Sequence, residues 1–112
     1  FIEKQRPLMP GTKTIVAPHN VEFTATLKSN PEKVKVSYLY MALSTMNVDP
    51  MPKANYRMFV ESQEGNIIPV YVEDASVKMI DQKTTLDQAF TFKGYHVYNY
   101  SKGPAMVITG IK

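Results

Sequence analysis

Apolar and polar residues alternate with a period of two in several short runs, and this pattern constrains the fold more than any other feature. The run VEFTATLK, residues 21–28, shows the alternation cleanly. Its apolar members are Val21, Phe23, Ala25 and Leu27. Successive side chains of a strand point to opposite faces, so this spacing predicts a strand with one buried face. The spacing recurs in residues 56–61, 67–72 and 90–111, which predicts a chain built of strands.

Turn residues separate the later runs at the spacing that hairpins need. Gly65 and Asn66 lie between residues 56–61 and 67–72, and such a pair between two alternating runs indicates a hairpin. The tripeptide SKG, residues 101–103, divides the last run in the same way. The sequence therefore predicts a central hairpin and a second hairpin that closes the chain.

The remaining segments have weaker patterns. Residues 1–20 carry three prolines and no helical period, so we expect an extended N-terminal arm. KVKVSYLYM, residues 33–41, alternates again and predicts an extra strand. The prolines, asparagines and aspartate of residues 44–55 predict a loop. The segment 75–88 is the one candidate for a short helix, which we expect Asp74 to cap.

Length and composition bound the architecture. A chain of 112 residues, 44% of them apolar, makes one domain with a single core. About five to seven strands in roughly 90 residues predict an all-β barrel or sandwich. We expect the domain over residues 21–112, preceded by the arm over 1–20, with at most one short helix. The chain has no run of about 18 apolar residues, so we expect no membrane-spanning helix.

No catalytic or metal-binding motif is present. The chain has no cysteine, its two histidines are far apart in the sequence, and its glycines are isolated rather than grouped in a phosphate-binding loop. We therefore expect neither an enzyme nor a cofactor or metal site. The net charge of +3 is uneven: residues 1–60 hold eight Lys and Arg against four acids, and the remainder holds five against six. This distribution is expected if one surface meets a polyanion, and the alternative is a chance scatter of charges over an ordinary protein surface.

The alternation sorts the side chains of the central hairpin into two faces. The inward set is Tyr56, Met58, Val60, Ile68, Val70 and Val72. Arg57, Phe59 and Tyr71 then point outward. A hairpin needs only one apolar face to close a core, so the outward rings beside an arginine require a separate explanation.

The closing hairpin repeats this arrangement. If Tyr95 and Val97 point inward with Phe90 and Phe92, the outward set is His96, Tyr98 and Tyr100. Gly94 is a natural position for a bulge, where the register can slip. Lys93 and Lys102 flank the rings.

Outward rings beside cations predict a binding surface for single-stranded nucleic acid. Unpaired bases stack on aromatic side chains for about 1–3 kcal/mol each, while Lys and Arg contact the phosphates. The candidate residues are Arg57, Phe59, Tyr71, Lys93, Tyr98, Tyr100, Lys102, Lys33 and Lys35. The alternative is structural: the rings pack on neighbouring strands, cover a loop or meet a subunit partner.

The order of these runs resembles the OB-fold. A first strand, a long excursion, the hairpin YRMFVESQEGNIIPVYVED, an intervening segment and the hairpin FKGYHVYNYSKGPAMVITGI are similar to strand 1, strands 2–3, the helix and strands 4–5 of that family. The resemblance covers residues 20–112 and is greatest to single-stranded DNA-binding proteins of the compact bacteriophage type. It implies a five-stranded, OB-fold-like Greek-key barrel, here with an extra strand and the N-terminal arm.

The resemblance also implies a function. OB-folds bind across strands 2–3 and between the loops that join strands 1–2 and 4–5. Carried over, these places correspond to Arg57, Phe59, Tyr71, Tyr98, Tyr100 and Lys102. The chain would bind single-stranded DNA with little sequence preference and protect strands in replication or recombination. A cytoplasmic location follows (the host's cytoplasm for a phage protein), with replication or recombination proteins as further partners.

Three further expectations complete this interpretation. The arm over residues 1–20 and the extra strand over 34–41 offer edges to a second copy, so we expect a homo-oligomer. A protein-interaction or viral structural β-module is the first alternative function, with the outward rings as interface anchors. An RNA-binding OB domain is the second.

Overall fold

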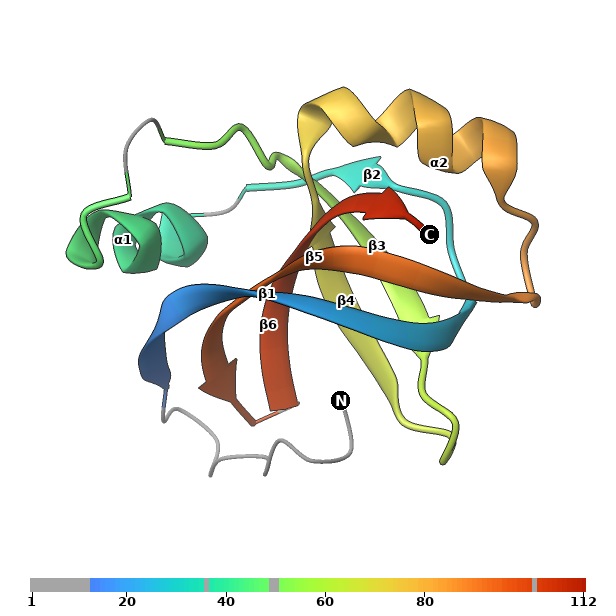
Figure 1. Ribbon diagram of the computed structural model, residues 1–112, viewed down its shortest axis with the longest axis horizontal. Helices are drawn as coiled ribbons and strands as arrows, with labels where there is room; N and C mark the ends of the chain where they lie inside the picture. The colour runs from blue at the N-terminus through green and yellow to red at the C-terminus, as the bar shows by residue number, and fades with distance from the viewer. Residues whose placement is uncertain (1–12, 36, 49–50, 102) are drawn as a thin grey trace.

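The computed structural model describes residues 13–35, 37–48, 51–101 and 103–112. Its strands are β1 (Thr14–Leu27), β2 (Glu32–Lys33), β3 (Tyr56–Glu61), β4 (Ile67–Val72), β5 (Ala89–Tyr100) and β6 (Gly103–Ile111). Its helical segments are α1 (Ser37–Thr45), the 3₁₀ turn η2 (Asp74–Ser76) and α2 (Val77–Lys83). None of the helices in these ranges is long and apolar enough to cross a membrane. Figure 1 shows strands wrapped around a centre, with α2 across one end and α1 to the side.

The strands form one sheet that closes on itself. β1 pairs with β5, β5 with β6, β6 with β4, and β4 with β3. The pairing of Thr26 and Leu27 with Glu61 and Val60 then joins β1 to β3 and completes the ring. The β4–β6 pair is parallel and the other pairs are antiparallel. The predicted all-β, barrel-like class is confirmed.

Both predicted hairpins are present. β3 and β4 pair from Tyr56↔Val72 to Glu61↔Ile67, and β5 and β6 pair as far as Tyr100↔Gly103. Gly65, in the first turn, has φ +88°, and Gly103, after the second, has φ +108°. A side chain is strained at such positive φ values, so glycine suits both positions. Local turn chemistry therefore identified both hairpins.

The barrel is filled by an inner core to which all five strands of the closed sheet contribute: β1, β3, β4, β5 and β6. Its buried residues are Phe23, Ala25, Leu27, Met58, Val60, Ile68, Val70, Val72, Ile80, Phe92, Met106 and Ile108. The predicted inward residues of β1, β3 and β4 belong to it or pack against it, so these faces are confirmed. Ile80 of α2 is fully buried in the same core, which fixes α2 across the end of the barrel.

A second apolar cluster lies outside the barrel, under α1. Its buried members are Leu39, Ala42, Leu43, Ala54, Val97, Tyr98, Ala105 and Val107, and we call it the outer cluster. The partly buried residues around it are Ile15, Val34, Tyr38, Tyr40, Val48, Tyr71, Tyr95 and Tyr100. It therefore contains six of the seven tyrosines of the chain. The wall formed by β5 and β6 is covered on both faces, which explains why most of β6 is buried.

The predicted strand over residues 33–41 is wrong. In the described part of residues 32–41, only Glu32 and Lys33 pair with β3, and α1 begins at Ser37. The fully buried residues of α1 are Leu39, Ala42 and Leu43. Their spacing of three and four residues is that of one helix face, and the burial of this face outweighs the alternation of the preceding residues. The described chain thus has two helices and η2, instead of at most one short helix.

The N-terminal boundary also differs from the prediction. Residues 14–20, expected in an arm, belong to β1, because β5 is long enough to pair with them through Asn99, Tyr98 and His96. Pro18, which cannot donate to a ladder, lies at the register shift between Ile15 and His19. The rest of the predicted arm, residues 1–12, lies outside the described residues.

Asp74 does not cap α2, because neither η2 nor α2 has a side-chain hydrogen bond at its N-cap. The Asp74 carboxylate instead accepts hydrogen bonds from the backbone N–H (2.8 Å) and Nδ2 (3.0 Å) of Asn55, which hold the pKa of Asp74 below its ordinary value. The Tyr40 hydroxyl donates to Asn55 Oδ1 (3.0 Å) and accepts from the Ala54 N–H (2.9 Å). These contacts tie α1 to the start of η2.

Candidate nucleic-acid interface

The register of β5 decides which rings reach the surface, and Gly94 controls it. The β5–β6 pairing shifts between Lys93 and Gly94 and again between His96 and Tyr98. A Cβ atom at Gly94 would overlap the backbone carbonyl of Val107 on β6, so only glycine fits this close approach. The predicted slip at Gly94 is confirmed, and the side chains that follow it are redistributed between the two faces of the sheet.

Two predicted orientations are therefore corrected. Tyr95 and Val97, expected inside, lie in the outer cluster. His96, expected on the surface, is 2% exposed and pairs across the sheet with the buried Met106. Its Nε2 is 3.1 Å from the Tyr98 carbonyl oxygen and 2.8 Å from Asn99 Oδ1. Both atoms are acceptors, so Nε2 carries the proton, and burial lowers the pKa of His96.

Tyr98 points out of the barrel as predicted, but it is covered. It is 3% exposed because α1 lies over it, with the Tyr38 ring edge-on at a centroid distance of 4.7 Å. The Tyr98 hydroxyl lies 3.3 Å from that of Tyr71, and the Tyr100 ring lies 5.7 Å away. Burial raises the pKa of Tyr98. The expectation that a base stacks directly on Tyr98 is therefore corrected: this ring supports its neighbours from behind.

Tyr71 and Tyr100 remain partly exposed at the edge of the outer cluster. Burial raises the pKa of Tyr100 to about 12; the nearby Tyr71 adds to this, and the positive charge of Arg57 opposes it. Arg57 is thus close enough to act on the Tyr100 hydroxyl. It is also the cross-strand neighbour of Tyr71 in the β3–β4 ladder.

Arg57 and Phe59 complete this group from β3. Arg57 is exposed, and its guanidinium carbon lies 5.2 Å from the centroid of the half-buried Phe59 ring. Such a cation–π contact holds the guanidinium in place and leaves its charge available. Glu32 of β2 is the neighbour of Arg57 on the other side. Across the described residues, no carboxylate oxygen lies within ion-pair distance of Arg57.

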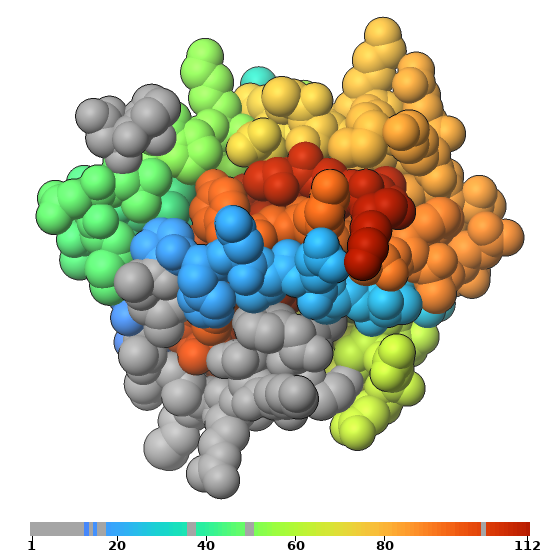
Figure 2. All heavy atoms as spheres, in the orientation of Figure 1, coloured from blue at the N-terminus to red at the C-terminus, as the bar shows by residue number. Residues whose placement is uncertain are grey.

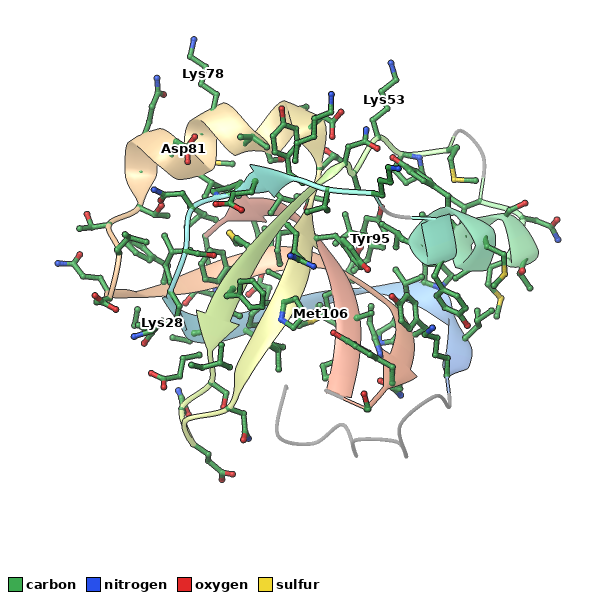
Figure 3. The ribbon with its side chains drawn as sticks, turned by 180° about the vertical axis from the view of Figure 1, so that it is seen from behind. Lys28, Lys53, Lys78, Asp81, Tyr95 and Met106 are labelled. Atoms are coloured by element: carbon green, nitrogen blue, oxygen red, sulfur yellow. The ribbon has the colours of Figure 1, made fainter. Side chains whose placement is uncertain are left out.

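We call Arg57, Phe59, Tyr71 and Tyr100 the ring face. Residues from β3, β4 and the end of β5 meet there, with Tyr98 behind them. Seen from behind, β3 and β4 are the strands nearest the viewer, and α1 lies farther to the right, on the side of β5 and β6 (Figure 3). The opposite side of the molecule has β1 across its centre, next to β5 and β6 (Figure 2). The structure thus brings together four of the predicted residues.

Three of the predicted lysines lie in the described part of the chain: Lys33 on β2, Lys35 just after it and Lys93 on β5. Lys93 lines a cavity of about 340 Å³ with Asn20, Glu22 and Thr109, on the β1–β5–β6 side of the barrel. Lys33 is the cross-strand neighbour of Tyr56, and its charge acts on the Asp74 carboxylate. Lys35 is exposed in the connection between β2 and α1. Lys102 lies outside the described residues.

Sequence reasoning missed Tyr38 and Lys13. The Lys13 ammonium nitrogen lies 4.3 Å from the centroid of the Tyr38 ring, which in turn contacts Tyr98. The helical spacing of Leu39, Ala42 and Leu43 was the available signal, because it places Tyr38 at the start of a helix that docks on the sheet. Nothing in the sequence linked Lys13 to that helix.

The ring face offers aromatic rings for stacking and one cation, the Arg57 guanidinium, for a charged contact. In the described part of the chain, no group of three or more His, Asp or Glu residues is placed to hold a metal ion. Comparison with protein-family models, with curated proteins and with solved structures gives no match, so the role of this face has to be inferred from its own geometry.

Proposed function

We propose that this barrel is an OB-fold and that its ring face binds single-stranded DNA with little sequence preference. Three features support the fold assignment. The five ring strands follow one another as β1, the β3–β4 hairpin and the β5–β6 hairpin; α2 lies between the two hairpins; and the ring closes from β3 to β1. An OB-fold is a five-stranded Greek-key barrel whose ligands lie across strands 2 and 3. Those strands correspond to β3 and β4, where the ring face lies.

The observation that carries the proposal is the convergence of an exposed cation and three partly exposed rings. Arg57 lies over Phe59 and next to Tyr71 in the ladder, and Tyr100 reaches the same edge of the outer cluster as Tyr71. A phosphate can pair with the guanidinium while adjacent bases contact the rings. Aromatic faces accept any base, so this arrangement predicts weak sequence preference.

Only unpaired bases can use such a face. In a duplex the base faces stack on one another and are not exposed to a protein surface, whereas a single strand exposes them. The three rings are partly buried side chains set against the sheet, which suits contact with bases that lie flat on it. We therefore expect single strands to bind and duplexes of the same length to bind far more weakly.

The test is a fluorescence-anisotropy titration of labelled oligo-dT, with duplex DNA and poly-U as competitors. Phe59→Leu and Tyr100→Leu should each weaken oligo-dT binding about 5- to 150-fold, because each removes about 1–3 kcal/mol of stacking. Leu86→Ala is the matched control, since Leu86 is an exposed apolar side chain (44%) that belongs to neither the ring face nor the outer cluster.

Each outcome of this titration decides between the candidate functions. No binding of oligo-dT at low salt would exclude the proposal and favour a protein-interaction module, in which the rings anchor a partner protein. Stronger competition by poly-U than by oligo-dT would instead indicate an RNA-binding domain, since RNA alone offers the 2′-hydroxyl. Equal loss of affinity in the variants and in Leu86→Ala would exclude the ring face as the site.

A further inference from the structure

We propose that the DNA-binding surface continues past the ring face to Tyr38 and Lys13, so that a single strand is held by a cation at each end of a row of rings. This inference rests on the proposed function and names two binding residues, Tyr38 and Lys13, that are not among the residues predicted from the sequence. It concerns the length of the bound strand and the residues that fix its two ends.

Contacts between tyrosines run from Tyr38 to Tyr71 and Tyr100, and the β3–β4 ladder links Tyr71 to Arg57. Tyr38 of α1 contacts Tyr98 at 4.7 Å, and Tyr98 contacts Tyr100 at 5.7 Å, both between ring centroids. The Tyr98 hydroxyl lies 3.3 Å from that of Tyr71, the cross-strand neighbour of Arg57. The series therefore runs from α1 across β5 and β4 to β3.

Each end of this series is occupied by a positive charge. Lys13 Nζ lies 4.3 Å from the centroid of Tyr38, and the Arg57 guanidinium carbon lies 5.2 Å from that of Phe59. In each pair the cation lies over the ring, so the end rings also hold the charge in place. Tyr71 and Tyr100 lie between the two pairs and offer further rings for base stacking.

Lys13 is suited to a phosphate contact. It is exposed, and within the described ranges no carboxylate oxygen lies within ion-pair distance of its ammonium group. The contact with Tyr38 limits the positions of a long side chain that is otherwise free to move, which lowers the entropy lost when it meets a phosphate. A single DNA strand that contacts Arg57 and then passes Tyr71 and Tyr100 would reach Lys13 at its other end.

The helix α1 supports this arrangement as a rigid element. Leu39, Ala42 and Leu43 bury its inner face against β5 and β6, and the Tyr40 hydroxyl joins it to Ala54 and Asn55. Tyr38 is therefore held at a fixed place relative to Tyr98. The long connection between β1 and β3 thus contributes the helix α1 to the proposed binding surface.

The length of the oligonucleotide separates this inference from the proposed function. OB-folds occupy about 4–16 nucleotides, so an oligo-dT of about 4 should be held at the ring face alone, while one of about 12 should also reach Lys13. Lys13→Ala should weaken binding of the long oligonucleotide about tenfold, through the loss of one charged contact, and leave the short one within about twofold. In the Lys13→Ala variant, the plot of the logarithm of the binding constant against the logarithm of the salt concentration should be less steep by about 0.7 for the long oligonucleotide.

Lys78→Ala is the matched control, because Lys78 is an exposed lysine on α2 that points away from the barrel (Figure 3). Tyr38→Phe, which keeps the ring, should retain long-strand affinity, and Tyr38→Leu should lose it. If wild type binds both oligonucleotides and Lys13→Ala behaves like Lys78→Ala with each, this inference is wrong and the proposed function stands. If wild type binds neither, the proposed function itself fails.

Discussion

Gly94 is the residue on which the positions of the rings depend. It allows β5 to lie so close to β6 that the register shifts, and the residues beyond it divide differently between the inner core and the outer cluster. His96 enters the interior and Tyr95 leaves it as a result. Gly94, a residue without a side chain, thus determines which tyrosines of β5 lie under α1 and which lie in the ring face.

Gly94→Ala should lower the free energy of unfolding by about 1–3 kcal/mol or more, because the new methyl group meets the Val107 backbone rather than a side chain that can move. Gly110→Ala, next to Lys93 in the same ladder, is the matched control: its nearest neighbours are side-chain carbons 3.7 and 3.8 Å away. Urea denaturation measures both. Equal stability of the two variants would contradict the close packing described at Gly94.

At the scale of elements, α1 determines how much of the tyrosine-rich surface is accessible. It buries Tyr98 and leaves Tyr71 and Tyr100 partly exposed, so it converts a broad aromatic surface into a narrow one. Two sets of contacts hold it: the apolar face against β5 and β6, and the polar contacts of Tyr40 with Ala54 and Asn55. The second set connects α1, through Asn55, to Asp74.

Tyr40→Phe tests this connection, since it removes the hydroxyl and keeps the ring. The Ala54 N–H loses its acceptor and Asn55 Oδ1 loses a donor, so we expect the free energy of unfolding to fall by about 1–3 kcal/mol. Hydrogen exchange should also quicken at the Ala54 amide more than in the β3–β4 ladder. Unchanged stability together with unchanged exchange at Ala54 would show that the apolar face alone holds α1.

The elements differ in how far the sequence predicts them, and the reason is physical. The strands β1, β3 and β4 and their buried faces can be predicted because apolar and polar residues alternate with a period of two within each segment. Residues 33–43 carry both a β-like alternation and the helical spacing of Leu39, Ala42 and Leu43, and only the docking of α1 on β5 and β6 decides between them. Burial of Tyr98 depends on the same long-range contact.

At the scale of the whole molecule, the barrel wall separates two apolar clusters. The inner core closes the barrel, and the outer cluster fixes α1 on its surface. The candidate site lies where the outer cluster ends and rings become accessible. Sequence patterns predicted the members of the ring face, but the neighbours of Lys93 and Lys33 are set by pairing between strands far apart in the sequence, which no local pattern shows.

The closed sheet also bears on self-association. The predicted homo-oligomer rested in part on an extra strand over residues 34–41, and that segment contributes α1 instead. β2 adds only Glu32 and Lys33 at the edge of β3, which is a short template for pairing with a second copy. Homo-oligomerisation stays a prediction, now without that strand as its support.

The central claim is that a single DNA strand lies on the ring face, and mapping backbone amide shifts by NMR during an oligo-dT titration tests it most directly. The account predicts progressive shifts for Arg57, Phe59, Tyr71 and Tyr100, while amides of α2 such as Lys78 and Asp81, on the end of the barrel (Figure 3), stay in place. Shifts confined to α2 or to the β1 surface around Glu22, with Arg57 and Phe59 unmoved, would contradict it.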